Sequence, residues 1–138
     1  MIIIQLLGGL GNQMFQYALG RQLAVLNNSE LKFDITGFTR DPLRKYSLNC
    51  FSLPENIASD SEIIQIKYGH RSQVLARVCD FLNRGLRRII GRKPIKASSY
   101  LIEKQIFCFD SKILKQRSQL YLEGYWQAHG YFSGIRKI

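Results

Sequence analysis

A glycine-rich loop near the start of the chain carries residues suited to binding an anion. The loop is Gly8–Gln13, called the glycine loop below, and it follows the apolar run Ile2–Leu7. Glycines adopt a positive φ without steric cost and leave backbone amides uncovered. Asn12 is expected to cap a helix that begins here, and a helix N-terminus attracts phosphate. On these residues alone, a ligand-facing loop and a structural turn stay equally open.

The common nucleotide-binding signatures do not fit the glycine loop. Met14 stands where G-x-G-x-x-G requires its third glycine, and no Gly-Lys-Ser/Thr follows as in a P-loop. Asp34 ends the next apolar run, about where a dinucleotide-binding domain keeps its ribose-binding acid. Because the glycine pattern is wrong, we interpret Asp34 as a strand-end or turn residue.

A second group of chemically apt side chains lies near the other end of the chain. Tyr125, Trp126 and Gln127 follow the apolar run Leu120–Gly124. Open α/β sheets bind ligands at the carboxyl ends of their strands, so the stretch Gly124–Gln127, called the aromatic turn below, is expected at such an edge. Trp126 has two interpretations of equal weight: a binding-site wall, or a core residue whose indole N–H has a partner.

Apolar runs that alternate with helical patterns predict an α/β fold with a mainly parallel sheet flanked by helices. Strands are predicted at Ile2–Leu7, Leu31–Ile35 and Leu120–Gly124, and an extended segment at Tyr100–Phe109. A helix is expected from the glycine loop to about Leu26.

Capping signals predict two shorter helices: Ser59–Tyr68 starts with a capping box of Ser59 and Glu62, and Asp110 caps a helix through Leu114. A third helix is predicted to begin in Gly130–Ile138, with Tyr131, Phe132 and Ile135 facing inward. The segment between the second strand and the capping box is expected to be a loop. The following residues are expected to anchor it on the core: Tyr46, Leu48 and Phe51. The loop also carries three basic residues, Arg40, Arg44 and Lys45. They are interpreted either as solvated surface side chains or as contacts to the acceptor or to a phosphate.

Length and composition limit the class of protein. The 138 residues, 46% of them apolar, suffice for one folded domain. No apolar run approaches the length of a membrane span, and Met1–Ile4 does not resemble a signal peptide, so a cytoplasmic protein is expected. Three widely spaced cysteines, Cys50, Cys79 and Cys108, fit neither a disulfide framework nor a zinc site. They are expected to be buried free thiols.

The net charge of +10 implies an anionic partner without choosing one. Val74–Ile90 has the pattern of an amphipathic helix. Six basic residues lie on its polar side or just after it: Arg84, Arg87, Arg88, Arg92, Lys93 and Lys96. Such a helix packs on the domain with solvated arginines, or lies on an anionic membrane, where weak, salt-sensitive binding is expected. Residues 84–96 contain no aromatic side chain, so no nucleic-acid partner is expected.

The residue sequences of both motifs resemble those of one enzyme family. The stretch from Gly8 through Ala18 is similar to the opening signature of the bacterial α-1,2-fucosyltransferases, glycosyltransferase family 11. Tyr121–Gln127 with Tyr131 and Phe132 resembles that family's G-Y-W-Q-S-x-x-Y-F segment. A less specific match, Arg44–Leu48 with Phe51, lies between them, and the three follow the family's order.

The resemblance implies a function and an architecture. It implies transfer of L-fucose, with inversion, from GDP-fucose to the 2-hydroxyl of a galactose-type glycan acceptor in surface-glycan synthesis, without a metal. It also implies a GT-B enzyme, with two Rossmann-like domains around a cleft. The family's basic donor motif, H-x-R-R-x-D, is not found in this sequence. Residues 1–138 are therefore expected to be an acceptor-side N-terminal domain, cut before the donor-binding domain and inactive alone.

The resemblance also assigns residues. Gly8, Gly9 and Gly11 are expected to form the turn, with Asn12 and Gln13 facing the interdomain cleft. The aromatic turn supplies the acceptor side through Tyr125, Trp126 and Gln127. No general base stands out; the candidates by residue type are Asp34, Asp41, Glu123 and His129. The alternatives are a basic anion-binding module and a non-catalytic nucleotide-binding Rossmann domain.

Overall fold

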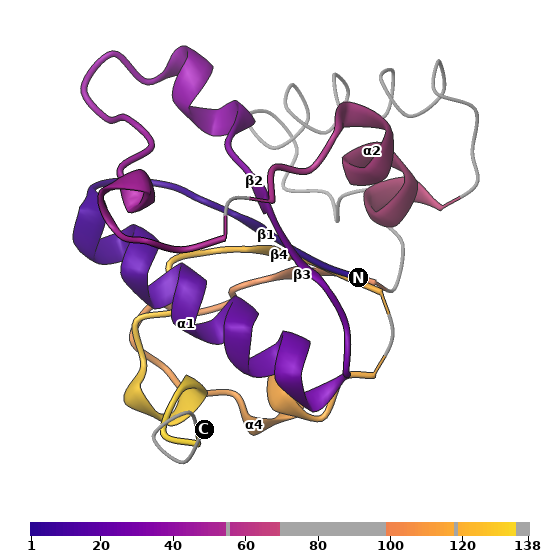
Figure 1. The fold of residues 1–138 in the computed structure, drawn as a ribbon. Helices are drawn as coiled ribbons and strands as arrows, with labels where there is room; N and C mark the ends of the chain where they lie inside the picture. The colour runs from indigo at the N-terminus through magenta and orange to yellow at the C-terminus, as the bar shows by residue number, and fades with distance from the viewer. Residues whose placement is uncertain (55, 70–98, 118, 135–138) are drawn as a thin grey trace, which may run out of the picture.

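The chain forms a Rossmann-like α/β fold in the computed structural model, which describes residues 1–54, 56–69, 99–117 and 119–134 (Figure 1). Its sheet has four parallel strands in the order β2-β1-β4-β3. The strands are β1 (Ile2–Gln5), β2 (Leu31–Asp34), β3 (Tyr100–Ile102) and β4 (Leu120–Glu123). The three predicted strands lie in this one sheet, so the predicted fold class is confirmed.

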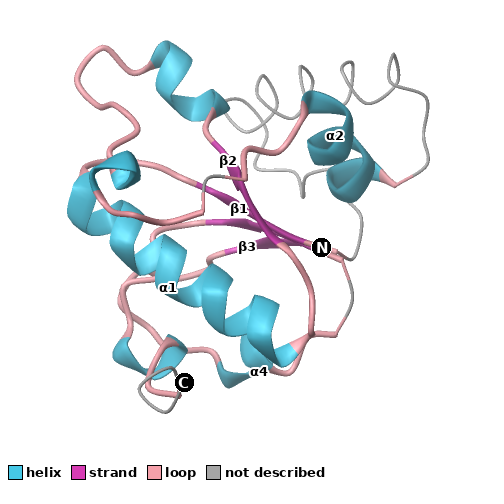
Figure 2. Cartoon of the chain, in the orientation of Figure 1, coloured by secondary structure: helices cyan, strands magenta, loops and turns pink. Residues whose placement is uncertain are grey.

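Helices cover both faces of the sheet (Figure 2). The long helix α1 (Leu10–Leu26) and the short α4 (Ser111–Leu114) lie on one face, and α2 (Asp60–Tyr68) lies on the other. Three short 3-10 helices belong to the connecting segments: η1 (Thr36–Arg40), η2 (Leu48–Cys50) and η3 (His129–Tyr131).

The central strand β1 is buried on both faces, as its β-branched sequence predicts. Ile2 and Ile4 join the core beneath α1, whereas Ile3 joins the core beneath α2, and all three side chains are fully inaccessible. The alternation follows from the two-residue period of a strand. Strand β1 therefore fixes the position of the glycine loop that follows it.

The start of α1 differs from its prediction. The helix begins at Leu10, so Gly9 is its N-cap, no side chain caps it, and Asn12 lies inside the first turn. Only Gly8 needs a positive φ (71°), because Gly9 is extended and Gly11 is helical. A Cβ on Gly11 would meet open space. The expected N-cap role of Asn12 is therefore wrong, and Gly11 has no conformational need for glycine.

Other capping signals are confirmed. Ser59 and Glu62 form both hydrogen bonds of a capping box at α2, and the Asp110 side chain accepts a hydrogen bond from the Lys112 amide at α4. The predicted extended segment after residue 100 keeps strand structure only through Ile102. In place of the predicted helix from Gly130, the described part contains only η3. Residues 135–138 and the predicted helix Val74–Ile90 lie outside the described residues.

The loop anchors and the cysteines differ in part from their predictions. Leu48 is buried and Tyr46 packs against the core, but Phe51 is 41% exposed because it follows the end of η2. Cys50 and Cys108 are free thiols, and both are exposed rather than buried. Cys79 lies outside the described residues.

A salt bridge between strand β2 and helix α2 predicts a pH effect on stability. Lys32 Nζ lies 2.6 Å from Glu62 Oε1, and hydrogen bonds from Lys32 and then from Ser59 lower the pKa of Glu62 from 4.5 to about 2. The stabilisation is complete above the unfolded-state pKa and is lost as pH falls from about 4.5 towards 2.

We therefore expect Glu62→Gln to weaken the dependence of unfolding free energy on pH across this interval. The measurement is a series of urea titrations from pH 4.5, the ordinary pKa of a glutamate, down to about pH 2, the lowered pKa of Glu62. Glu30→Gln is the control, because Glu30 Oε2 lies 3.9 Å from Lys32 Nζ and its side chain is half exposed. An equal flattening by both variants would contradict the assignment to Glu62.

Candidate functional site

The two motifs meet at the carboxyl edge of the sheet. Strands β1 and β4 are parallel neighbours, so the glycine loop and the aromatic turn leave the sheet side by side. A hydrogen bond of 2.7 Å joins them directly, from Gln127 Nε2 to Asn12 Oδ1. Both side chains are partly exposed. Residues 115 positions apart in the chain therefore form one polar surface at the edge where α/β sheets bind ligands.

A buried glutamine reinforces this junction from below. Gln16 is fully inaccessible, accepts a hydrogen bond of 3.0 Å from the Leu7 amide, and donates one of 2.9 Å to the Gly124 carbonyl. Its amide thus replaces the ladder hydrogen bonds that the two strands lose as they diverge. Gln16 fixes the separation of the glycine loop and the aromatic turn.

Gln13 holds the glycine loop rather than facing outward. Its side chain is fully buried, and its Nε2 donates to the carbonyls of Gly8 (3.0 Å) and Lys45 (2.9 Å). Its Oε1 accepts from the Ser47 amide at 2.9 Å. This geometry differs from the expected exposure to a cleft, because the segment around residues 45–47 covers the side chain. Gln13 is therefore placed to set the shape of the loop.

The aromatic turn has an unusual backbone that one carboxylate stabilises. Trp126 has φ of 57°, and bulky residues in this region cost about 1–3 kcal/mol. Glu103, just beyond β3, accepts the Tyr125 amide at 2.7 Å and the Trp126 amide at 3.1 Å. Charge-assisted hydrogen bonds of this kind are about twice as strong as neutral ones. They offset the conformational cost of the turn.

Trp126 belongs to the core in this structure. Its side chain is 1% exposed and packs edge-to-face on Tyr131, with ring centroids 5.7 Å apart. The indole nitrogen has no hydrogen-bond partner among the described residues. With so little accessible area, the indole face is not free for a sugar to stack upon. The burial of Trp126 therefore favours its interpretation as a core residue over that of a binding-site wall. The hydrogen-bond partner predicted for its indole N–H is not found among the described residues.

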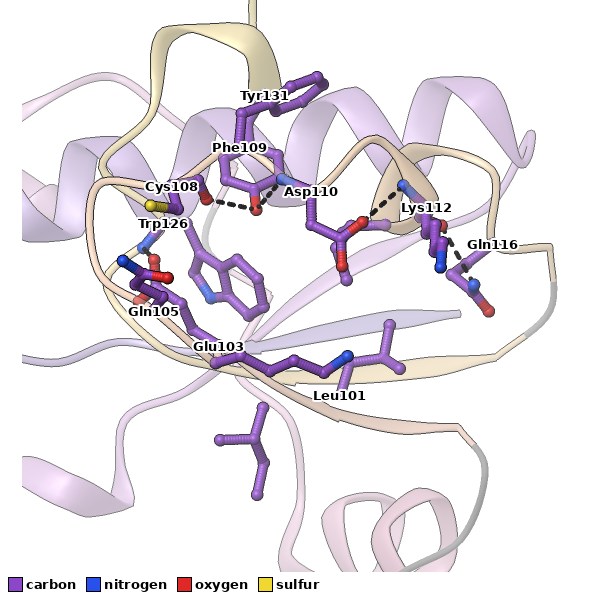
Figure 3. A pocket seen from close by; sticks show the side chains of 13 residues that line it. Leu101, Glu103, Gln105, Cys108, Phe109, Asp110, Lys112, Gln116, Trp126 and Tyr131 are labelled. Carbon is purple, nitrogen blue, oxygen red and sulfur yellow. Dashed lines mark hydrogen bonds between the residues drawn. The ribbon is translucent and has the colours of Figure 1, made fainter.

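A pocket of about 360 Å³ lies beneath the aromatic turn, between the end of β3 and α4 (Figure 3). Glu103 and Trp126 contribute to its wall, and the exposed ring of Phe109 packs against Tyr131 with centroids 5.0 Å apart. The Tyr131 hydroxyl accepts from the Asp110 amide and donates to the Cys108 carbonyl. These hydrogen bonds connect the segment 108–110, on one side of the pocket, to η3, which follows the aromatic turn. Burial raises the pKa of the Tyr131 hydroxyl.

Asp34 is a structural carboxylate. It is fully inaccessible, and it accepts hydrogen bonds from the Thr36 amide (2.9 Å), the Thr36 hydroxyl (2.6 Å) and the Tyr121 hydroxyl (2.5 Å). Burial, followed by the nearby Asp34 charge, raises the pKa of Tyr121, so this hydroxyl stays protonated and donates. The interpretation of Asp34 as a strand-end turn residue is therefore confirmed, and its carboxylate is not accessible to a ribose.

The three remaining candidates for the general base differ in where they lie. Glu123 ends β4 beside the aromatic turn, is partly exposed, and accepts a hydrogen bond from the Tyr100 hydroxyl. Asp41 accepts the amides of Leu43 and Arg44 within its own loop. His129 is exposed, on η3 beyond the turn. Among these four candidates, Glu123 alone is a partly exposed acid at the end of a central strand.

The glycine loop offers uncovered amides and a nearby cation. The N-terminus of α1 has no side-chain cap and no acidic residue in its first turn. A guanidinium nitrogen of Arg44 lies within about 4.0 Å of the position that a Cβ on Gly9 would occupy. Helix amides and a neighbouring guanidinium form an environment suited to negative charge.

In the part of the chain that the structure describes, no group of three or more His, Cys, Asp or Glu side chains is arranged to hold a metal ion. In the same part, no helix has the length and apolarity that crossing a membrane requires. The basic residues of segment 84–96 lie outside the described residues.

Two residues of the site were not selected by sequence reasoning. Gln16 follows the glycine loop within the α1 pattern, and Glu103 lies in a segment predicted only to be extended. Nothing in their spacing indicates their partners, because those contacts join strands that are distant in sequence. For Gln16 a signal existed, since it is a polar residue three positions before Leu19 and so lies on the side of α1 that also buries Leu19 and Leu23.

The fold and site define a Rossmann-like α/β domain whose polar surface lies at the carboxyl edge of its central strands. The chain is similar to an alpha-1,2-colitosyltransferase of Escherichia coli, with 29% identity over 133 residues. That alignment covers 95% of this chain and 40% of the relative, so the chain spans about 40% of the relative's length. No family model and no solved structure matches the chain. The likeness supports the glycosyltransferase class in general.

Proposed function

We propose that the chain is the N-terminal, acceptor-side domain of a GT-B α-1,2-glycosyltransferase that moves L-fucose from GDP-fucose to a galactose-type 2-hydroxyl. The observation that carries this proposal is the Gln127–Asn12 hydrogen bond, which unites the two fucosyltransferase-like motifs on one surface. The similarity to a 1,2-glycosyltransferase over 95% of the chain supports it independently. The proposed setting is surface-glycan synthesis in the cytoplasm, with weak contact to an anionic membrane.

Each side of the junction has a proposed role. Asn12 and the uncovered amides of α1 lie where a departing diphosphate would gain from hydrogen bonds, with Arg44 beside them. Tyr125 and Gln127 are the partly exposed residues of the aromatic turn, and they are suited to contact the acceptor sugar. Trp126 supports the turn from the core. Transfer needs a proton acceptor for the attacking hydroxyl, and Glu123 is the best-placed acid of the four candidates.

Colitose is the second candidate for the transferred sugar, because the relative is described as a colitosyltransferase. Colitose is L-fucose without its 3-hydroxyl group. A site that hydrogen-bonds this hydroxyl rejects the deoxy sugar strongly, whereas a site without such a contact accepts both. The proposed donor-binding domain makes that choice, so the two donors are compared directly.

The test is a transfer assay with a β-galactoside acceptor and either GDP-fucose or GDP-colitose. We expect turnover with GDP-fucose from a protein extended through the proposed second domain, and none from the 138-residue chain. The glycine loop alone leaves the anion open to water on one side, and water competes for each amide. Turnover by the short chain would contradict the proposed division of the site between two domains.

Asn12→Ala tests the site within the extended protein. We expect kcat/KM to fall about 10-fold or more, because the variant removes a polar group from the reacting edge and releases Gln127. Asn49→Ala is the matched control, since Asn49 is exposed on η2. Wild-type turnover by Asn12→Ala would remove this residue from the site.

A further inference from the structure

A carboxylate outside both motifs controls the backbone of the aromatic turn. Glu103 lies one residue past β3, and its amide donates to the Glu123 carbonyl at 2.9 Å, which extends the pairing of β3 with β4. Its two carboxylate oxygens accept separate amides, Oε2 from Tyr125 and Oε1 from Trp126. One side chain therefore binds two consecutive amides, an arrangement that specifies both distance and direction.

Close approach of Glu103 to the turn depends on Gly124. A Cβ added to Gly124 would overlap Glu103 Cβ and press on the Trp126 ring. Figure 3 shows Glu103 and Trp126 together in the wall of the pocket. The missing side chain at Gly124 thus brings the carboxylate within reach of the two amides.

The turn is held in a conformation that it would not adopt unaided. Trp126 has a positive φ, which non-glycine residues avoid unless the surroundings over-determine it. Two restraints act on it: the Glu103 hydrogen bonds to the backbone, and the burial of the indole against Tyr131. With the indole fixed inward, the positive φ directs the chain so that Gln127 reaches Asn12.

We propose that Glu103 is a positioning residue of the transferase: it holds the aromatic turn so that Tyr125 and Gln127 meet the acceptor sugar in a fixed orientation. The claim that the turn positions an acceptor sugar rests on the proposed function. The hydrogen-bonded restraint itself is independent of that function. Glu103 acts through the turn and Gln127, and has no direct contact with substrate.

The first measurement follows the turn itself in the 138-residue chain. Trp126 is the only tryptophan, so its fluorescence reports this turn alone. Glu103→Gln keeps the size of the side chain but places an amide NH₂ group against a backbone N–H. We expect a red-shifted emission and stronger acrylamide quenching, with the far-UV circular dichroism of the wild type. Glu30→Gln, at an exposed position, is the control and should leave both fluorescence properties unchanged.

The second measurement uses the extended enzyme. Glu103→Gln should raise the KM for the β-galactoside about 10-fold or more while the KM for the nucleotide sugar stays within about 2-fold. Gln127→Ala should produce the same pattern and leave the Glu103 hydrogen bonds intact. In the double variant the two effects should not add, because both act through one turn. A merely structural role would instead lower the amount of active enzyme and spare both KM values.

The outcomes separate the two proposals. Unchanged Trp126 emission and quenching in Glu103→Gln would overturn the restraint, and so would additive effects with Gln127→Ala. A shifted Trp126 signal with unchanged acceptor KM would overturn the positioning role. If the extended wild type transferred neither sugar, the transferase proposal would fail, and with it the acceptor-positioning role. The Trp126 signal would still decide whether Glu103 holds the turn. If Glu103→Gln failed to fold, Gln127→Ala would decide whether the turn positions the acceptor.

Discussion

A Gly124→Ala variant is expected to lose about 3 kcal/mol of unfolding free energy, the combined cost of overpacking and of a backbone unsuited to alanine. Gly124 has φ of 157°, and its missing Cβ leaves room for Glu103 and for the Trp126 ring. The nearest atom, Glu103 Cβ, is fixed to the backbone next to β3 and cannot move aside as the end of a flexible side chain can. Relief therefore requires the sheet edge or the turn to shift.

The measurement is the urea midpoint of the 138-residue chain, with Gly11→Ala as the matched control. Gly11 lies in α1 with open space where a Cβ would be. Alanine there should keep stability or raise it by up to about 1 kcal/mol, since it favours helix over glycine. Equal losses in both variants would refute the claim that glycine is required specifically at position 124.

This pair of glycines shows where sequence reasoning succeeds and where it stops. Three glycines in the first motif predict a tight turn, and the turn exists, but only Gly8 there has a positive φ. Position within the motif does not reveal which glycine is strained, because the answer depends on where α1 starts. Gly124 ends a predicted strand, and its requirement comes from Glu103, a residue of another strand's edge.

Local signals predicted much of the fold. The β-branched run at Ile2–Ile4 predicts a strand buried on both faces, and the capping box of Ser59 and Glu62 predicts the start of α2. These signals involve neighbouring residues, whose interactions need no knowledge of the tertiary structure. The expectation for Asn12 as a helix cap was local too, and it failed because α1 begins at Leu10 and its N-cap is Gly9, which has no side chain to mark it. Uncapped helix ends leave no pattern to find.

The site required the tertiary structure. Sequence placed the two motifs at strand ends, but the order β2-β1-β4-β3 is what makes the last described strand a neighbour of the first. That order brings Asn12 to Gln127. The same packing buries Gln13 and Trp126, two residues whose types suggest ligand contact. Residue type indicates which chemistry is available, whereas burial decides which side chains can perform it.

Gln16→Leu is expected to cost about 3 kcal/mol of unfolding free energy, although leucine is nearly as large as glutamine and more apolar. Gln16 is fully buried and binds the Leu7 amide and the Gly124 carbonyl. Leucine leaves both backbone groups without that partner, and each unsatisfied group costs about 1–3 kcal/mol. The apolar gain of a leucine offsets part of this loss. The site should respond as well, because these two bonds set the spacing of the glycine loop and the aromatic turn.

Gln65→Ala serves as the control for replacing a helical glutamine, because Gln65 is exposed on α2 and should change stability by less than about 0.5 kcal/mol. Urea titration gives the stability of each variant, and the fluorescence of Trp126 reports the aromatic turn. We expect Gln16→Leu alone to shift that fluorescence below the unfolding transition, since Gly124 loses its anchor to α1. Wild-type stability and emission in Gln16→Leu would mean that pairing of β1 with β4 aligns the two motifs without the glutamine.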